Sequence, residues 1–141
     1  MATVLIVDDE ESVRRLLGEM LTRSGHETLE AATGEEALER LIQRPVDLVL
    51  ADVLMPGQGG LWMTAEIRRR YPSVPVILVT GVLDVEARIT LMEGVVAYIV
   101  KPFDRPTLER ATLKALKWRE DYIARSSPKT AQLEDWFASE E

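Results

Sequence analysis

Short apolar runs alternate with amphipathic stretches along this chain, and the alternation limits the folds that it can adopt. The runs are five to seven residues long and rich in Val, Ile and Leu, which is typical of strands buried on both faces. The four strong runs are residues 3–7, 46–51, 74–80 and 95–100, and a weaker strand is expected at 27–31. The weaker run is more polar, so we expect it nearer an edge of the sheet.

Helical periodicity fills the segments between the runs. Helices are predicted around residues 13–21, after a capping box at Thr33 and Glu36, at about 60–70, at about 84–93, and after Asp104. Strands and helices that alternate in this way form a parallel sheet with helices on both faces. We therefore predict one α/β domain, with a doubly wound five-stranded parallel sheet in the strand order 2-1-3-4-5.

Polar side chains follow the carboxyl ends of the predicted strands. Asp8 and Asp9 follow the first strand, and Asp52 follows the third. Thr80 ends the fourth strand, and Lys101 follows the fifth. The carboxyl ends of parallel strands meet at one edge, and ligands bind there where the strand order reverses, here between strands 1 and 3. We expect these five side chains to lie together at that edge.

Carboxylates gathered in one place repel one another unless a cation or a proton relieves the repulsion. Mg²⁺ typically takes one or two carboxylates, water and a substrate phosphate, so Asp9 and Asp52 are the expected direct ligands, with Asp8 acting through water. A carboxylate beside a metal can also form an acyl phosphate, whose oxygens need positive charge and donors around them. The sequence therefore predicts Asp52 as a phosphate acceptor, with Lys101 and Thr80 contacting the phosphoryl group.

Four motifs carry a resemblance to a known family. They are VLIVDDE at residues 4–10, DVLMPG at 52–57, TG at 80–81 and YIVKPF at 98–103. In this order and spacing they resemble the receiver domains of two-component response regulators, over about residues 1–120. The resemblance implies a flavodoxin-like receiver fold, a Mg²⁺ cofactor, and a signalling switch that is not an enzyme beyond catalysing its own phosphorylation and dephosphorylation.

The resemblance also implies roles for the acidic positions. Asp52 matches the phosphoacceptor of the family, and Asp8 and Asp9 match its acidic metal pair. Leu54 matches the position whose backbone carbonyl binds the metal. These roles agree with the metal site expected from the strand ends.

Three further positions match the switching residues of the family. Thr80 matches the switch hydroxyl, and Lys101 matches the lysine that pairs with the phosphate. Tyr98 matches the aromatic residue that turns inward when Thr80 moves onto the phosphoryl group. The resemblance also implies a cis peptide bond before Pro102.

Two stretches depart from the family pattern. Gly59 and Gly60 stand where Asp-Gly is more usual, and Val-Val-Ala at residues 95–97 stands where Ala-x-Asp is more usual. Neither stretch belongs to the residues assigned to the chemistry, so we expect them to affect loop shape and surface contacts.

The expected partners follow from the resemblance and from the composition. A sensor histidine kinase or a phosphotransfer protein would donate the phosphoryl group, and the fourth helix, fifth strand and fifth helix would form the readout face, with homodimerisation as one output. The net charge of −7 disfavours direct nucleic-acid binding. No apolar run approaches the ~20 residues that span a membrane. With no cysteine and no such run, we predict a cytoplasmic protein without a membrane partner. The one histidine, His26, is expected in a solvent-exposed loop.

The chain divides into a predicted receiver domain at residues 1–122 and a linker with a short amphipathic tail at 123–141. The tail places Leu133, Trp136 and Phe137 among acidic residues. It is too short to be an output domain. Two alternatives follow, a single-domain regulator or the N-terminal part of a longer regulator.

Three other functions fit parts of the sequence. A flavodoxin-like cofactor binder needs a first loop that binds phosphate, but the first loop here is acidic and would repel it. An aspartate-nucleophile phosphohydrolase needs a second acid two residues after the nucleophile, where Leu54 stands. A phosphorylation-independent, receiver-like interaction module remains the alternative to the phosphorylation switch.

Overall fold

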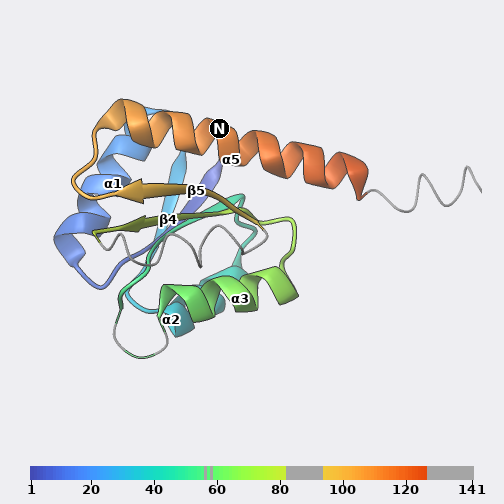
Figure 1. Cartoon of the computed structure of the whole chain (residues 1–141), viewed down its shortest axis with the longest axis horizontal. Helices are drawn as coiled ribbons and strands as arrows, with labels where there is room; N and C mark the ends of the chain where they lie inside the picture. The colour runs from blue at the N-terminus through green and yellow to red at the C-terminus, as the bar shows by residue number, and fades with distance from the viewer. Residues whose placement is uncertain (56, 58, 82–93, 127–141) are drawn as a thin grey trace, which may run out of the picture.

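Five parallel strands form the centre of the computed structural model, which describes residues 1–55, 57, 59–81 and 94–126 (Figure 1). The strands are β1 (Thr3–Val7), β2 (Glu27–Ala31), β3 (Leu48–Asp52), β4 (Val76–Thr80) and β5 (Val95–Val100). Their order in the sheet is β2-β1-β3-β4-β5, and every neighbouring pair is parallel. The predicted α/β fold with the strand order 2-1-3-4-5 is confirmed.

Helices cover both faces of the sheet. The helices within the described ranges are α1 (Glu11–Arg23), α2 (Gly34–Gln43), α3 (Gly60–Arg70) and α5 (Arg105–Arg125). Helices α2 and α3 lie on one face, and α1 and α5 lie on the other (Figure 1). The helix predicted at 84–93 lies outside the described residues. None of these four helices has the length and apolar character that a membrane span requires.

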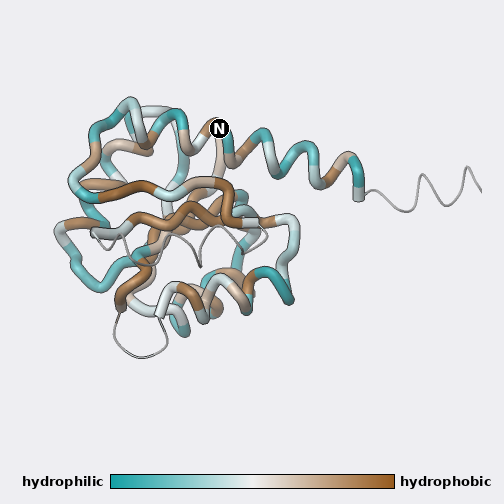
Figure 2. Tube along the Cα trace, in the orientation of Figure 1, coloured by the Kyte–Doolittle hydropathy of each residue, from teal (hydrophilic) through white to brown (hydrophobic). Residues whose placement is uncertain are grey.

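Strands β1, β3 and β4 are almost entirely apolar because both of their faces are buried. Along β1, Leu5 and Val7 pack on the side of α2 and α3, whereas Val4 and Ile6 pack on the side of α1 and α5. Every residue of β3 and of β4 is buried. Figure 2 shows the resulting hydrophobic colour along the sheet. Burial on two sides explains why these strands appear in the sequence as unbroken apolar runs.

Strands β3 and β4 begin two residues later than the apolar runs predicted. Val46 and Val74 are buried, with 4% and 5% exposure, but both precede the paired residues. Asp47 instead binds across to Thr3, donating its N–H to the Thr3 carbonyl at 2.8 Å and accepting the Thr3 N–H on Oδ2 at 2.8 Å. The apolar runs are therefore longer than the strands, because residues just before the paired segments are also buried.

His26 lies in the loop between α1 and β2 and is half-buried, so the expected solvent exposure is wrong. Its Nδ1 accepts a hydrogen bond from the backbone N–H of Ala2 at 3.2 Å. Burial, and then the charge of the N-terminus, lower the pKa of His26 below its usual value. The neutral ring therefore joins the start of the chain to the turn after α1.

Helix α5 continues beyond residue 122, the predicted end of the receiver domain, and ends at Arg125. Its last turns extend past the sheet (Figure 1). Arg119 holds the helix against the domain, since its Nε lies 3.3 Å from Asp47 Oδ1 and its Nη1 donates to both the carbonyl and the hydroxyl of Ser73. The rest of the predicted tail lies outside the described residues, so the division of the chain stays a prediction.

The N-terminus of α2 contains the predicted capping interaction and allows a test of it. Thr33 Oγ1 accepts a hydrogen bond from the N–H of Glu36 at 3.1 Å, and Glu36 Oε2 accepts one from the N–H of Ala32 at 3.3 Å. Thr33→Ala removes the first acceptor and should lower the free energy of unfolding by about 1 kcal/mol. Urea denaturation measures this change, with Thr33→Ser as the control that keeps a hydroxyl. Equal stability of Thr33→Ala and the unmodified chain would contradict the capping role.

Candidate functional site

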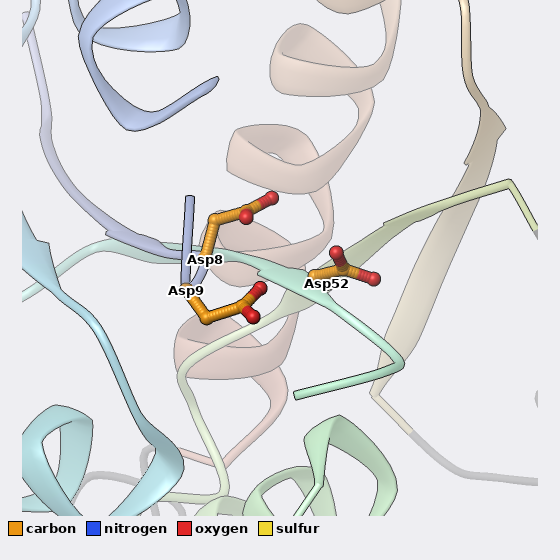
Figure 3. Close-up of side chains that lie close together, drawn as sticks. All are labelled: Asp8, Asp9 and Asp52. Carbon is orange, nitrogen blue, oxygen red and sulfur yellow. The ribbon is translucent and has the colours of Figure 1, made fainter. Parts of the chain in front are cut away.

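Three carboxylates lie together at the carboxyl edge of the sheet (Figure 3). Asp8 and Asp9 directly follow β1, and Asp52 is the last residue of β3. These strands are neighbours whose register pairs Val7 with Ala51, so the residues that come next also adjoin. One oxygen from each carboxylate lies within 4.8 Å of the other two. Asp8 and Asp52 are buried, with 1% and 8% exposure, whereas Asp9 is exposed.

Lys101 brings positive charge to two of these carboxylates. Its Nζ lies 3.1 Å from Oδ2 of Asp8 and 3.1 Å from Oδ2 of Asp52. Lys101 follows β5, and its backbone N–H donates to the carbonyl of Thr80 at 2.9 Å, which continues the pairing of β4 with β5. The Lys101–Pro102 peptide bond is cis, as the resemblance implied.

The pKa of the Lys101 ammonium is raised above its usual value. Burial alone would lower this pKa, because surroundings of low polarity disfavour the charged form. The hydrogen bonds to Asp52 and Asp8, and the negative charge of these two groups, outweigh the effect of burial. The ammonium is therefore charged at neutral pH and offsets part of the repulsion at this edge. Three carboxylates still outnumber one ammonium, which favours a bound cation.

Backbone N–H groups hold the two buried carboxylates in place. Oδ1 of Asp8 accepts a hydrogen bond from the N–H of Glu10 at 2.9 Å. Oδ1 of Asp52 accepts one from the N–H of Leu54 at 3.1 Å. Each of these carboxylates therefore has a backbone donor on one oxygen and the Lys101 ammonium near the other, which defines its orientation.

Arg14, in the first turns of α1, contacts the site although it was not among the predicted site residues. Its Nη1 donates to the backbone carbonyl of Asp8 at 2.6 Å, and its Nε lies 3.0 Å from Oε1 of Glu30. The Arg14 side chain is 16% exposed. In the sequence Arg14 follows the first apolar residue of a helical stripe and has the position of a surface residue, so no local signal indicated this contact.

Thr80 and Tyr98 lie on the neighbouring strands β4 and β5. Thr80 is the last residue of β4, is 1% exposed and pairs in register with Val100. Tyr98 pairs with Leu78, is half-buried and packs on the side of α2 and α3. Thr80 thus lies at the same edge as the carboxylates. Tyr98 lies two residues further from that edge, since it precedes Val100, the register partner of Thr80, by two positions. The switch roles of both residues stay predictions, as does metal binding by the Leu54 carbonyl.

Gly60, the first residue of α3, contacts the backbone of Asp52. Its N–H donates to the carbonyl of Val53 at 3.0 Å. A Cβ at this position would overlap the carbonyl oxygen of Asp52, so a side chain fits only if the backbone moves. Gly60 therefore lies against the backbone of the residue that carries the Asp52 carboxylate, whereas the expected effect of Gly59 and Gly60 on loop shape and surface contacts stays a prediction. Gly59 is the N-cap of α3 and provides no side-chain hydrogen bond to it.

Curated proteins of similar sequence are named as transcriptional regulators. The probable transcriptional regulator ycf27 of Guillardia theta is 42% identical over 125 residues, which are 88% of this chain and 48% of that protein. The transcriptional regulatory protein GlrR of Escherichia coli (strain K12) is 34% identical over 135 residues, which cover 89% of this chain and 30% of that protein. This chain thus spans about half the length of the first relative and about a third of the second.

Solved structures of similar fold are receiver proteins. The response regulator TrrA of Thermotoga maritima, in complex with Mg²⁺-BeF, has a TM-score of 0.76 and 35% identity, over 82% of this chain and 100% of that chain. A response regulator receiver domain protein of Clostridium thermocellum has a TM-score of 0.78 and 29% identity, over 85% of this chain and 98% of that chain.

The family model for the response regulator receiver domain matches residues 4–113, which is most of the chain. Except for Thr3 at the start of β1, the matched range contains all five strands, and it contains the carboxyl edge at which the acidic residues meet. The same range contains every residue to which the resemblance assigned a role. This chain belongs to the receiver-domain family of two-component response regulators.

Proposed function

We propose that Asp52 accepts a phosphoryl group and that this chain acts as a phosphorylation switch. The observation that carries the proposal is the cluster of three carboxylates within 4.8 Å, with the Lys101 ammonium 3.1 Å from the acceptor carboxylate. The donor would be a phosphohistidine on a sensor histidine kinase or on a phosphotransfer protein. The chain would catalyse this transfer to itself and act as a signalling switch thereafter.

The transfer exchanges one bond at phosphorus for another. An oxygen of Asp52 forms the new O–P bond as the P–N bond to the donor histidine breaks, and the imidazole keeps the electron pair and regains a proton. Negative charge spreads over the phosphoryl oxygens during transfer, so positive charge and donors around them lower the barrier. Lys101 would leave Asp52 to pair with one phosphoryl oxygen, and the Thr80 hydroxyl would donate to another.

The residues at the carboxyl edge fit Mg²⁺. The available donors are carboxylate and carbonyl oxygens, which this hard cation prefers, and the site carries more negative than positive groups. Asp9 and Asp52 would bind the ion directly, Asp8 through water, and the Leu54 carbonyl would complete the protein ligands. When bound, the ion would neutralise charge on the phosphoryl oxygens. The Mg²⁺-BeF complex of the T. maritima relative supports this assignment.

Thr80 and Tyr98 would pass the signal on. They lie on adjacent strands, so a Thr80 hydroxyl drawn toward the phosphoryl group would leave room for the Tyr98 ring to turn inward. The readout would use the face that contains β5 and α5, with homodimerisation as one output. The longer curated relatives are named transcriptional regulators, so DNA binding would belong to a further domain and not to this segment of net charge −7.

The phosphoacceptor can be tested by intact mass. With acetyl phosphate and Mg²⁺, the unmodified chain should gain one phosphoryl group, and Asp52→Asn should gain none because an amide oxygen is a much weaker nucleophile. Asp121→Asn, at an exposed ion pair with Lys117 on α5, is the matched control and should be phosphorylated normally. Phosphorylation of Asp52→Asn would remove Asp52 from its role. A chain that is never phosphorylated would support the interaction-module alternative.

The metal site can be tested without phosphorylation. Mg²⁺ at 100 times its dissociation constant should raise the free energy of unfolding of the unmodified chain by about 2.7 kcal/mol. In Asp9→Asn most of this gain should disappear, and calorimetry should show weaker Mg²⁺ binding. Asp9 is exposed, so the substitution should leave the metal-free fold intact. Unchanged Mg²⁺ affinity in Asp9→Asn would remove Asp9 from the ligand set.

Gly60 offers a test of how the site is positioned. In Gly60→Ala the new methyl group must displace the Asp52 backbone, which should cost about 1–3 kcal/mol of stability and slow phosphorylation of Asp52. Gly18→Ala is the matched control, because a Cβ there would meet only Ile6 and Thr28 side chains at ordinary distances of 3.8 and 3.9 Å. Equal phosphorylation rates in Gly60→Ala and Gly18→Ala would show that the close contact does not position Asp52.

A further inference from the structure

A second charged site lies at the opposite edge of the sheet from Asp52. A cavity of about 310 Å³ opens where the chain enters β3 and β4, between the ends of α2 and α3 and the side of α5. Arg44, Arg70 and Arg119 line it. Leu41, Val46 and Tyr71 add apolar surface to its wall. Among the described residues that line the cavity, none is acidic. The cavity therefore combines an apolar wall with a basic rim.

The three arginines can bind a further anion. Each already contacts one carboxylate: Arg44 contacts Glu27 at 2.6 Å, Arg70 contacts Glu66 at 3.0 Å, and Arg119 contacts Asp47 at 3.3 Å. A guanidinium carries five N–H donors in a planar fork, so it can pair with a second carboxylate. The three side chains are 45%, 42% and 23% exposed, which leaves them accessible.

The C-terminal tail has the matching chemistry. Residues 133–137, outside the described ranges, read Leu-Glu-Asp-Trp-Phe, and Glu140 and Glu141 follow. Residues 127–141 contain four acidic residues and one lysine. Two aromatic rings and a leucine suit the apolar wall, and the neighbouring carboxylates suit the arginines. In a protein of net charge −7, three arginines around one cavity offer an acidic segment a surface of opposite charge.

The tail is long enough to reach the cavity. Arg119 lines the cavity and lies seven positions before Ser126, so the end of α5 is about 10 Å away along the helix axis. The six residues at 127–132 span up to about 20 Å when extended. They can therefore carry residue 133 back past the last turns of the helix.

An aromatic surface joins the cavity to the end of α5. Arg68 donates to the carbonyl of Pro72, which lines the cavity, at 2.9 Å, and it lies over the Trp118 ring at 5.5 Å. Trp118 stacks on Tyr122 with 5.2 Å between the ring centroids. A tail that turns back from Ser126 would thus meet aromatic surface before it meets the arginines.

We propose that the acidic, aromatic segment at residues 133–137 folds back within its own chain and docks in the cavity lined by Arg44, Arg70 and Arg119. This goes beyond the proposed phosphorylation and does not depend on it. The docked tail leaves the carboxyl edge with Asp52 open, because the cavity lies at the other ends of β3 and β4.

The absence of cysteine allows a single spin label to test the proposal in the full chain. A nitroxide attached at Ser139→Cys should broaden the backbone amide signals of Val46, Tyr71 and Ser73 in NMR spectra. Isotope-labelled, spin-labelled protein diluted into plain protein reports contacts within one chain. Isotope-labelled protein mixed with spin-labelled, plain protein reports contacts between chains. The proposal expects broadening in the first sample only.

Charge reversal separates docking from mere proximity. Arg44→Glu with Arg70→Glu should abolish the broadening, and adding Glu134→Arg with Asp135→Arg should restore it. Arg15→Glu, at an exposed ion pair on α1 outside this cavity, is the matched control and should leave the broadening unchanged. The proposal is overturned by no broadening, by broadening only between chains, by broadening centred elsewhere, or by broadening that survives the reversal.

Discussion

The ammonium of Lys101 between Asp8 and Asp52 is the interaction on which the functional edge depends. Two carboxylates with 1% and 8% exposure at the ends of adjacent strands repel each other and have lost most of their hydration. One ammonium 3.1 Å from both offsets that cost. Lys101 reaches them from β5, two strands away from β3 in the sheet. The site therefore exists only when the strand order is complete, which couples the chemistry to the whole fold.

The same edge also depends on the backbone. The N–H groups of Glu10 and Leu54 orient the two buried carboxylates, and Gly60 lets the first turn of α3 approach the Asp52 peptide. Asp9 differs from its two neighbours because it is exposed. Asp9 is thus the acid most open to solvent, while Asp8 and Asp52 are each held by a backbone N–H and by Lys101. This division agrees with separate roles for the three acids.

Much of this arrangement could be predicted from the sequence, because strand ends are marked by a change from apolar to charged residues. Asp8, Asp52 and Lys101 each follow or end such a run, and parallel pairing then brings them together. The contacts of Arg14 and Gly60 could not be predicted, since each depends on where a helix lies over the sheet and not on a local pattern. The burial of His26 also could not be predicted from a local pattern, because its partner, the backbone N–H of Ala2, is 24 positions away.

Charge at the two edges of the sheet follows from the direction of the helices. In a parallel sheet with helical crossovers, helix N-termini lie at the carboxyl edge and helix C-termini at the opposite edge. Helix C-termini favour cations, and Arg44 and Arg70 stand at the ends of α2 and α3. This accounts for each arginine singly, but it does not account for their convergence with Arg119 around one apolar wall. An acidic tail would be repelled at the carboxyl edge and attracted at the other, so the polarity that places the acidic cluster at one edge also favours docking of the tail at the opposite edge.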